Sequence, residues 1–278
     1  MRHVLTRHGR AALAALLDRD PVLAFDFDGT LAALTPYPDR ARLTARTRGL
    51  LARLAGRRPV VIISGRARAD VAGRFDGIGL AGVTGNHGLE PWGETEATAR
   101  LVRQWRRRLE ADLADLPGVI IQDKRWSLTV DYRWAPDLET TEQRVKEAVR
   151  TLPRVRLLGG RHADYNLAPA GRINKGTALR RHLRELGRRA ALYVGDDRTD
   201  EDVFALDLPA LMSVRVGRRR DSHAEFYLRD QSEVDRLLEH LNALAGGHER
   251  QRPDPARSTP PPVPRRGPSA SPGRGELR

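Results

Sequence analysis

The segment Asp26-Phe27-Asp28-Gly29-Thr30 directly follows the short apolar run Val22-Leu23-Ala24-Phe25. Because this run shows no polar alternation, it predicts a strand buried on both faces of a parallel sheet. Asp26 and Asp28 then stand at the carboxyl end of the strand, the edge where open parallel sheets bind ligands. Residues two apart point the same way, and Gly29 lets the backbone turn sharply, so both carboxylates face one point. Such carboxylates repel one another, and a hard divalent cation, above all Mg²⁺, would relieve the repulsion.

Three further motifs fall at the same predicted edge or at the start of a helix. Ile62-Ile63-Ser64-Gly65-Arg66 ends a second apolar run and offers a hydroxyl to a phosphoryl oxygen. Lys175 opens a predicted helix, whose N-terminus also favours anions. The run from Gly195 to Asp202 ends a third apolar stretch and supplies carboxylates for a metal. Each motif alone is compatible with a turn, a helix cap or a solvated side chain, but their order along the chain favours a catalytic edge.

Apolar runs alternate with amphipathic stretches along most of the chain, which is typical of an α/β fold with a parallel sheet between helices. The predicted strands of this sheet are residues 22–25, 60–63, 81–84, 190–194 and 213–216, and the predicted helices are residues 43–54, 175–186 and 201–206. Between residues 90 and 169 the pattern becomes a helix followed by two short strands, and this unit repeats. The helices are expected near residues 101–116 and 140–152, with strands at 119–122, 127–132, 155–158 and 163–167. We therefore predict a small α+β unit inserted into the larger domain.

The composition narrows the functional classes. None of the 278 residues is cysteine, which excludes disulfides, thiolate zinc sites and cysteine nucleophiles and agrees with a reducing cytosol. No apolar run reaches membrane-spanning length and residues 1–10 lack a secretory pattern, so we expect a cytoplasmic protein with no membrane partner. The net charge of +13 suggests nucleic-acid binding, but the basic residues are scattered and rarely interleaved with aromatic ones, so we expect none. Residues 246–278 are rich in Pro, Arg, Ser and Gly, which predicts a disordered tail.

The four motifs resemble those of the haloacid dehalogenase (HAD) superfamily of phosphatases, over about residues 20–245. The resemblance implies a Rossmann-like HAD core, with a parallel sheet and helices on both faces, and an inserted α+β cap domain of the C2 type. It assigns residues 1–88 and 170–245 to the core and residues 89–169 to the cap.

The motif residues also fit the hydrolysis of a phosphate monoester, one of the slowest uncatalysed reactions. In this interpretation Asp26 is the nucleophile that forms an aspartyl-phosphate, and Asp28 acts first as general acid and then as general base. Ser64 and Lys175 hold the phosphoryl oxygens. The predicted magnesium site consists of Asp26, the backbone carbonyl of Asp28 and Asp196, with Asp200 behind them.

Within the superfamily the chain is most similar to the trehalose-6-phosphate phosphatases. The similarity lies in Gly85-Asn86-His87-Gly88-Leu89-Glu90, in the acidic run up to Phe204, and in the cap residues Lys124, Ser127, Tyr132 and Arg133. It implies trehalose 6-phosphate as the substrate and a small-molecule sugar phosphate as the partner. The oligomeric state stays open at this point, with a monomer favoured. The residues expected to bind the substrate are Gly65, Arg66, Asn86, His87, Gln122, Lys124, Arg133 and Asn166.

Three cap positions depart from that family's pattern. Gln122 and Asn166 stand where the family has Glu, and Asp131 stands where it has His. Because a carboxylate accepts stronger hydrogen bonds from sugar hydroxyls than an amide does, these changes can alter which disaccharide fits. The alternative substrate is therefore a related glycosyl or pseudo-disaccharide (aminocyclitol) phosphate. A sugar-phosphate-binding protein without catalysis is a further alternative, against which the intact Asp26 and Asp28 speak.

Overall fold

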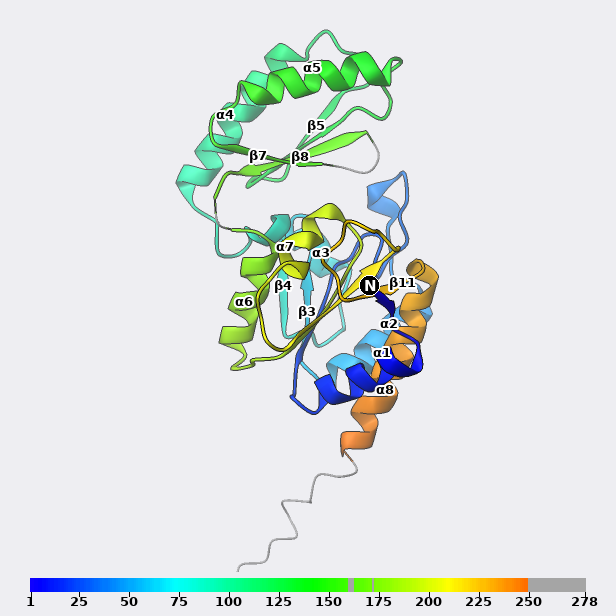
Figure 1. The fold of residues 1–278 in the computed structure, drawn as a ribbon. Coiled ribbons are helices and arrows are strands. Elements are labelled where there is room, and N and C mark those ends of the chain that lie inside the picture. The colour runs from blue at the N-terminus through cyan, green and yellow to red at the C-terminus, as the bar shows by residue number, and fades with distance from the viewer. Residues whose placement is uncertain (160–162, 172, 250–278) are drawn as a thin grey trace, which may run out of the picture.

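The computed structural model describes residues 1–159, 163–171 and 173–249 and contains two sheets (Figure 1). The larger sheet has seven parallel strands in the order β1-β11-β10-β9-β2-β3-β4. Its strands are β1 (Arg2–His3), β2 (Val22–Phe25), β3 (Val60–Ile63), β4 (Gly82–Thr84), β9 (Ala191–Gly195), β10 (Leu211–Val216) and β11 (Phe226–Leu228). The three strands that carry Asp26, Ser64 and Asp196 at their carboxyl ends are therefore neighbours, as β9-β2-β3.

Helices cover both faces of this sheet because its strands are apolar on both faces. In β2, Leu23 and Phe25 join one hydrophobic cluster while Val22 and Ala24 join the cluster on the other face. The first cluster includes residues of α1 (Arg7–Leu17), α2 (Ala45–Ala55), α3 (Arg68–Gly73) and α8 (Val234–Glu249), and the second includes residues of α6 (Lys175–Glu185) and α7 (Glu201–Phe204). Short 3₁₀ turns complete the unit at η1 (Pro38–Arg40), η2 (Asn86–Gly88), η3 (Arg198–Asp200) and η4 (Gln231–Glu233). The continuous apolar runs thus form central strands, as predicted.

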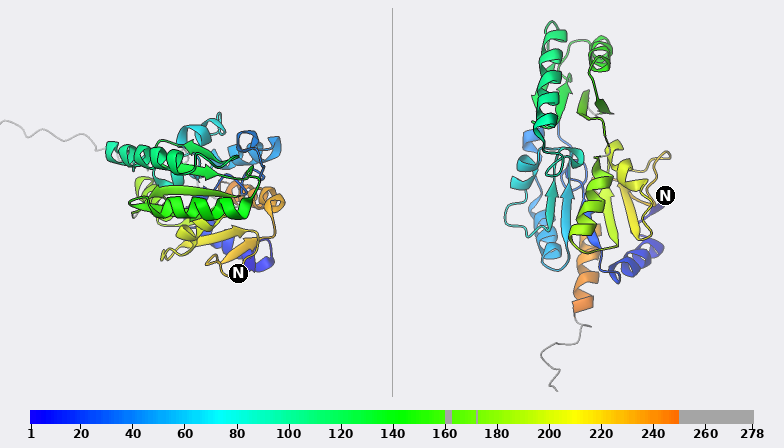
Figure 2. Two further views of the ribbon diagram at one scale, coloured as in Figure 1. Left: turned by 90° about the horizontal axis from the view of Figure 1, so that it is seen from above. Right: turned by 90° about the vertical axis from the view of Figure 1, so that its left-hand side faces the viewer.

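The smaller sheet is antiparallel and stands over one end of the larger one (Figure 2). It comprises β5 (Ile120–Asp123), β6 (Leu128–Asp131), β8 (Asp164–Pro169) and β7 (Val155–Gly159), in that order. Two helices, α4 (Glu96–Asp112) and α5 (Leu138–Arg150), cover the face turned away from the larger sheet (Figure 1). Along β6, Leu128 and Val130 pack in the core under these helices, whereas Thr129 and Asp131 line a cavity on the other side. Alternation of apolar and polar residues therefore gives this sheet one polar face.

The predicted fold class is confirmed, with a few corrections. The sequence pattern did not predict α1, α3, α8, β1 and β11. It also placed the start of the tail too early, because residues 246–249 continue α8; the rest of the predicted tail lies outside the described residues. The division of the chain at residues 88 and 169 stays a prediction. Among the described residues, no helix has both the length and the apolar character needed to cross a membrane.

Trp105 is the central side chain of the smaller unit, and we predict that its replacement loosens that unit. It is fully buried on α4, and its indole N–H donates to the carbonyl of Pro153 at 2.9 Å. Trp105→Ala should destabilise the unit by about 3–5 kcal/mol, measured as faster amide hydrogen exchange along β6. Trp134→Ala is the matched control, since Trp134 is 58% exposed and its loss should change stability by less than about 0.5 kcal/mol. Equal effects of the two changes would contradict the assigned core.

Candidate active site

The candidate site is built on a buried lysine between two buried aspartates. The ammonium of Lys175, the first residue of α6, lies 3.0 Å from Oδ2 of Asp26 and 2.8 Å from Oδ1 of Asp200. Asn174 caps this helix by accepting from the N–H of Thr177, which fixes where the helix begins. Burial alone would lower the pKa of Lys175, but Asp200 and Asp26 raise it above its ordinary value. The lysine is therefore held as a cation.

Asp26 is set up differently from an ordinary carboxylate. Burial raises its pKa well above the usual range; Lys175 opposes that rise, and Asp200 and Asp196 add to it. Oxygens of Asp26, Asp196 and Asp200 all lie within 4.8 Å of one another, and all three residues are buried. One lysine does not neutralise the charge of three buried carboxylates, so a further cation would be favourable here. Because all the donor atoms are oxygens, a hard divalent cation is the type that suits the site. The residues present therefore fit the metal that the sequence predicts.

Asp200 has a positioning role in this cluster, because its oxygens are already saturated. Its Oδ1 accepts from Lys175 and from the hydroxyl of Tyr193 at 2.7 Å, and its Oδ2 accepts from the backbone N–H groups of Asp196 and Asp197 at 2.8 and 2.7 Å. Burial opposes it, but the charge of Lys175 and the hydrogen bonds from Lys175, Tyr193 and the N–H of Asp197 lower the pKa of Asp200. A carboxylate with four donors has little capacity left for a cation, so Asp26 and Asp196 are the better placed side-chain ligands.

The carboxylate of Asp28 lies outside that cluster and is held by Arg66. Arg66 donates from Nε to Oδ2 and from Nη2 to Oδ1, both at 2.7 Å, in a bidentate pair. The same guanidinium also bonds Asp70 and the carbonyl of Pro38. The expectation that the backbone carbonyl of Asp28 binds a metal is compatible with this geometry, since the side chain is engaged elsewhere.

Ser64 is fully buried and does not line the cavity. Its hydroxyl accepts from the N–H of Arg66 at 3.2 Å and so shapes the turn after β3. Gly65 and Arg66 form the cavity wall at this point instead. Gly65 is required there because a Cβ would lie 2.4 Å from the ring of His87.

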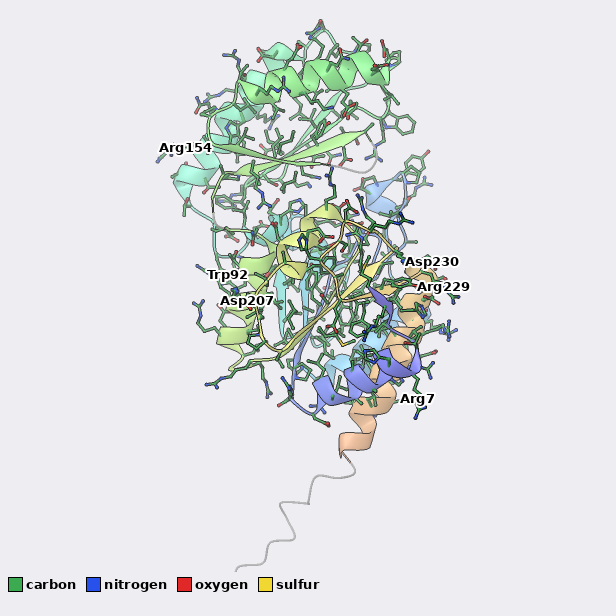
Figure 3. The ribbon with its side chains drawn as sticks, viewed as in Figure 1. Arg7, Trp92, Arg154, Asp207, Arg229 and Asp230 are labelled. Atoms are coloured by element: carbon green, nitrogen blue, oxygen red, sulfur yellow. The ribbon has the colours of Figure 1, made fainter. Side chains whose placement is uncertain are left out.

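A cavity of about 510 Å³ separates the carboxyl edge of the larger sheet from the polar face of the smaller sheet. This size falls within the ~300–1,000 Å³ of ordinary small-molecule sites. Side chains from both units extend into the space between them (Figure 3). The residues that line the cavity and were predicted for the site are Asp26, Asp28, Gly65, Arg66, His87, Gln122, Lys124, Arg133, Asn166, Lys175 and Asp196.

The side of the cavity formed by the smaller sheet is called the roof below, and the side formed by the larger sheet the floor. Lys124 and Asn166 are connected by a hydrogen bond in the roof. The ammonium of Lys124 donates at 3.2 Å to Oδ1 of Asn166 and at 3.2 Å to the carbonyl of Gly65 in the core. Thr129 donates to the same Asn166 oxygen at 2.7 Å. Burial and the neighbouring Arg66 lower the pKa of Lys124 to about 8. Asn166 therefore orients Lys124 through its oxygen.

Arg133 contacts protein groups in addition to lining the cavity. Its Nε donates to Asp131 at 2.8 Å, and its Nη1 donates to the carbonyl of Pro36 at 2.7 Å. Pro36 belongs to the loop after β2, so Arg133 joins the roof to the floor. The predicted role of Arg133 in substrate binding stays a prediction.

The segment around His87 has an unusual backbone. Asn86, His87 and Gly88 have φ of 48°, 56° and 106°, in the left-handed region that non-glycine residues seldom adopt. His87 is 8% exposed, lines the cavity, and neither ring nitrogen has a hydrogen-bond partner among the described residues. Burial lowers its pKa well below the usual range, and Lys175 and Lys124 lower it further. A strained, neutral imidazole at a cavity wall is typical of a functional position.

Asn86 is fully buried and does not line the cavity. Its amide donates to the carbonyl of Lys124 at 3.3 Å, and its oxygen accepts from Ser127. The family motif thus places this asparagine between the two units, and the geometry favours an interface role over direct substrate contact.

Tyr193, Thr30 and Arg215 are site residues that the sequence analysis did not assign. Thr30 donates to Oδ1 of Asp196 at 3.0 Å, and Arg215 donates to the carbonyls of Asp196 and Asp197. Thr30 belongs to the first motif, which was a usable signal. Tyr193 and Arg215 lie inside strands, where no local pattern distinguishes them from structural residues.

A buried lysine and buried aspartates lie at the carboxyl edge of a parallel sheet, under a smaller α+β unit, and solved phosphatases of the HAD superfamily share this fold. Residues 24–232 match the trehalose-phosphatase family model, and the chain belongs to this family.

Two curated relatives are similar in sequence. A trehalose-phosphate phosphatase of Mycobacterium avium (strain 104) is 38% identical over 208 residues, covering 68% of this chain and 52% of the relative. The chain thus spans about half the length of the mycobacterial relatives that it matches. The probable trehalose-phosphate phosphatase 9 of Oryza sativa subsp. japonica is 31% identical over 276 residues, covering 84% of this chain and 73% of the relative.

The C-terminal domain of C. albicans trehalose-6-phosphate phosphatase has a similar solved structure. It superposes with a TM-score of 0.69 at 24% identity, covering 85% of this chain and 96% of that one. At this identity the similarity supports the fold.

Gly29 provides a test of the metal site. A Cβ on Gly29 would lie 2.0 Å from Oδ2 of Asp196, whereas a Cβ on Gly77 would meet nothing within 4 Å. The two glycines have nearly the same φ, +78° and +80°, so alanine costs both a similar backbone strain of about 1–3 kcal/mol. We predict that Gly29→Ala abolishes Mg²⁺ binding in calorimetric titration and that Gly77→Ala retains it. Equal Mg²⁺ affinities would show that Asp196 does not need this space.

Proposed function

We propose that this chain is a Mg²⁺-dependent phosphatase that hydrolyses trehalose 6-phosphate to trehalose and phosphate through an aspartyl-phosphate on Asp26. The observation that carries the proposal is the buried group of Asp26, Lys175 and Asp196 at the floor of a cavity with a polar roof. Membership of the trehalose-phosphatase family supports the substrate. The absence of cysteine agrees with work in a reducing cytoplasm.

In the first step a carboxylate oxygen of Asp26 attacks phosphorus, and the bond between phosphorus and the sugar oxygen breaks. Lys175 stays beside Asp26 and neutralises charge on the phosphoryl oxygens. Asp28 gives a proton to the departing sugar oxygen. Because Arg66 now occupies both oxygens of Asp28, we expect substrate binding to displace Arg66 before this transfer.

In the second step Asp28 removes a proton from water, which attacks phosphorus and releases phosphate, restoring Asp26. When bound by Asp26, Asp196 and the carbonyl of Asp28, Mg²⁺ supplies charge neutralisation for the transferred group. Asp200 keeps Lys175 and the backbone of Asp196 in place throughout.

The roof of the cavity offers the groups that bind sugar hydroxyls. Gln122, Thr129 and Asn166 present amides and a hydroxyl on the face toward the core. His87 presents a neutral imidazole from the core side, which can donate or accept one hydrogen bond. Such a mixed set matches the hydroxyls of a disaccharide.

A second candidate substrate is a pseudo-disaccharide phosphate that carries an amine. Asp131 and Asp164 are directly opposed on β6 and β8, and both line the cavity. Two carboxylates opposite one another repel; Arg133 already pairs with Asp131 at 2.8 Å, and a positively charged amine on the substrate would reduce the repulsion further. This observation keeps aminocyclitol phosphates as the competitor of trehalose 6-phosphate.

Replacement of the proposed nucleophile is the first test. Asp26→Asn should lower phosphate release by roughly 10⁴-fold or more, because the covalent step is lost. It should also eliminate the hydroxylamine-sensitive phosphoryl-protein that quenching of the wild-type reaction is expected to trap. The control Asp221→Asn alters an exposed ion pair with Arg219 and should leave both measurements unchanged. Turnover by Asp26→Asn at the wild-type rate would refute the nucleophile.

The substrate is tested by kcat/KM for trehalose 6-phosphate, sucrose 6-phosphate, glucosylglycerol phosphate and an aminocyclitol-containing phosphate. We predict that trehalose 6-phosphate is preferred by about 100-fold or more, as expected for a site that pairs hydroxyls. A preference for the aminocyclitol compound would replace it as the substrate.

The substitution Gln122→Ala tests sugar binding by the roof separately from phosphate chemistry at the floor. Gln122 lines the cavity, so its loss should lower kcat/KM for the preferred sugar phosphate by about tenfold, the worth of one hydrogen bond. The rate with p-nitrophenyl phosphate, which has no sugar, should not change. Gln104→Ala on the exposed side of α4 is the control. An equal loss with both substrates would contradict a sugar-binding role for Gln122.

A further inference from the structure

The loop that follows β9 is held by hydrogen bonds on two sides. The N–H groups of Asp196 and Asp197 both donate to Asp200, at 2.8 and 2.7 Å. The carbonyls of the same two residues both accept from Arg215, at 2.6 Å from Nη2 and 3.1 Å from Nη1. Both peptide units on either side of the Asp196 side chain are thereby fixed in orientation.

Arg215 reaches this loop from inside the sheet. It lies on β10, where it is paired in register with Gly195 of β9, and it is 3% exposed. Its Nη1 also donates to Oε1 of Glu201 at 2.9 Å, and Oε2 of Glu201 accepts from the N–H of His223 at 2.9 Å. The guanidinium therefore joins the loop to the first residue of α7.

Burial of the Arg215 guanidinium costs desolvation free energy, which charge pairing and hydrogen bonds must offset. Its neighbours Val214 and Val216, which point to the opposite face of β10, are buried and apolar. Arg215 does not line the catalytic cavity, so it does not act on the substrate directly. What it contacts is the backbone behind Asp196.

We propose that Arg215 is a positioning residue for the cation site, which fixes the Asp196–Asp197 peptides so that the Asp196 carboxylate is presented to Mg²⁺. The inference rests on the proposed function, since it assumes that Asp196 binds the cation. Groups that orient metal ligands from behind typically change metal affinity by about 10–100-fold when they are removed.

Two substitutions of Arg215 separate the effect of the planar guanidinium geometry from the effect of its charge. Arg215→Met removes all three hydrogen bonds while retaining a long apolar stem. Arg215→Lys keeps the charge but offers a point donor, which cannot reproduce a planar fork shared by two carbonyls and Glu201. We therefore expect Arg215→Met to raise the Kd for Mg²⁺ by about 10–100-fold and Arg215→Lys to raise it by about 3–10-fold.

The test is calorimetric titration of the full chain with MgCl₂ in the absence of substrate. The rate of phosphate release is then measured against Mg²⁺ concentration. At saturating Mg²⁺ the variants should recover kcat to within a few-fold, with KM for the sugar phosphate unchanged, because Arg215 does not contact it. The control is Arg219→Met, which removes an exposed arginine paired with Asp221 and should leave the Kd unchanged.

A folded Arg215→Met variant with the wild-type Kd for Mg²⁺ would overturn the inference. If circular dichroism shows that Arg215→Met does not fold, Arg215→Lys decides, and a wild-type Kd there overturns it equally. If the wild-type chain binds Mg²⁺ and hydrolyses the substrate, and these variants bind Mg²⁺ with the wild-type Kd, only the role of Arg215 is refuted. A wild-type chain that binds no Mg²⁺ refutes the metal in the proposed function instead.

Discussion

The ion pairs of Lys175 with Asp26 and Asp200 are the interaction on which the rest of the structure depends. A lysine that is 2% exposed is stable as a cation only while these carboxylates stay within hydrogen-bond distance. That distance requires α6 to begin at Lys175, which the Asn174 cap provides, and requires α6 to lie close to α7. Gly176 allows this approach, since a Cβ there would lie 2.2 Å from the carbonyl of Asp202. The packing of α6 against α7 and the ion pairs of Lys175 therefore depend on one another.

The two sheets divide the chemistry between them because their strands are patterned differently. The core strands are apolar on both faces, so only their carboxyl ends are available to a ligand. The strands of the smaller sheet alternate apolar and polar residues, so one face of this sheet, with Gln122, Thr129, Asp131 and Asn166, lines the cavity. Under the proposed function, phosphate chemistry depends on a few side chains at strand ends, while recognition of the sugar is spread over a polar sheet. The departures Gln122, Asp131 and Asn166 all fall on the second part.

Contacts between the two units involve residues that also surround the cavity. Lys124 bonds Gly65, Arg133 bonds Pro36, and Arg156 of β7 pairs with Asp202 of α7 at 2.8 Å. Lys124 and Arg133 both line the cavity. Under the proposed function, a sugar phosphate that enters the cavity competes with some of these contacts, which couples binding to the relative position of the two units.

The sequence by itself determined the central strands of the larger sheet, the order of the motifs and the sheet edge at which they meet, because continuous apolar runs and the residues that end them are local signals. It left β1 undetected, since a strand of two residues is too short to show a period, and it also missed β11. Only the tertiary structure decided that Ser64 and Asn86 lie off the cavity, that Arg66 holds Asp28, and that Tyr193 and Arg215 support Asp200 and Asp196. Most of these contacts join residues that are distant in the chain, and their geometry depends on how strands and helices pack, which no local pattern specifies.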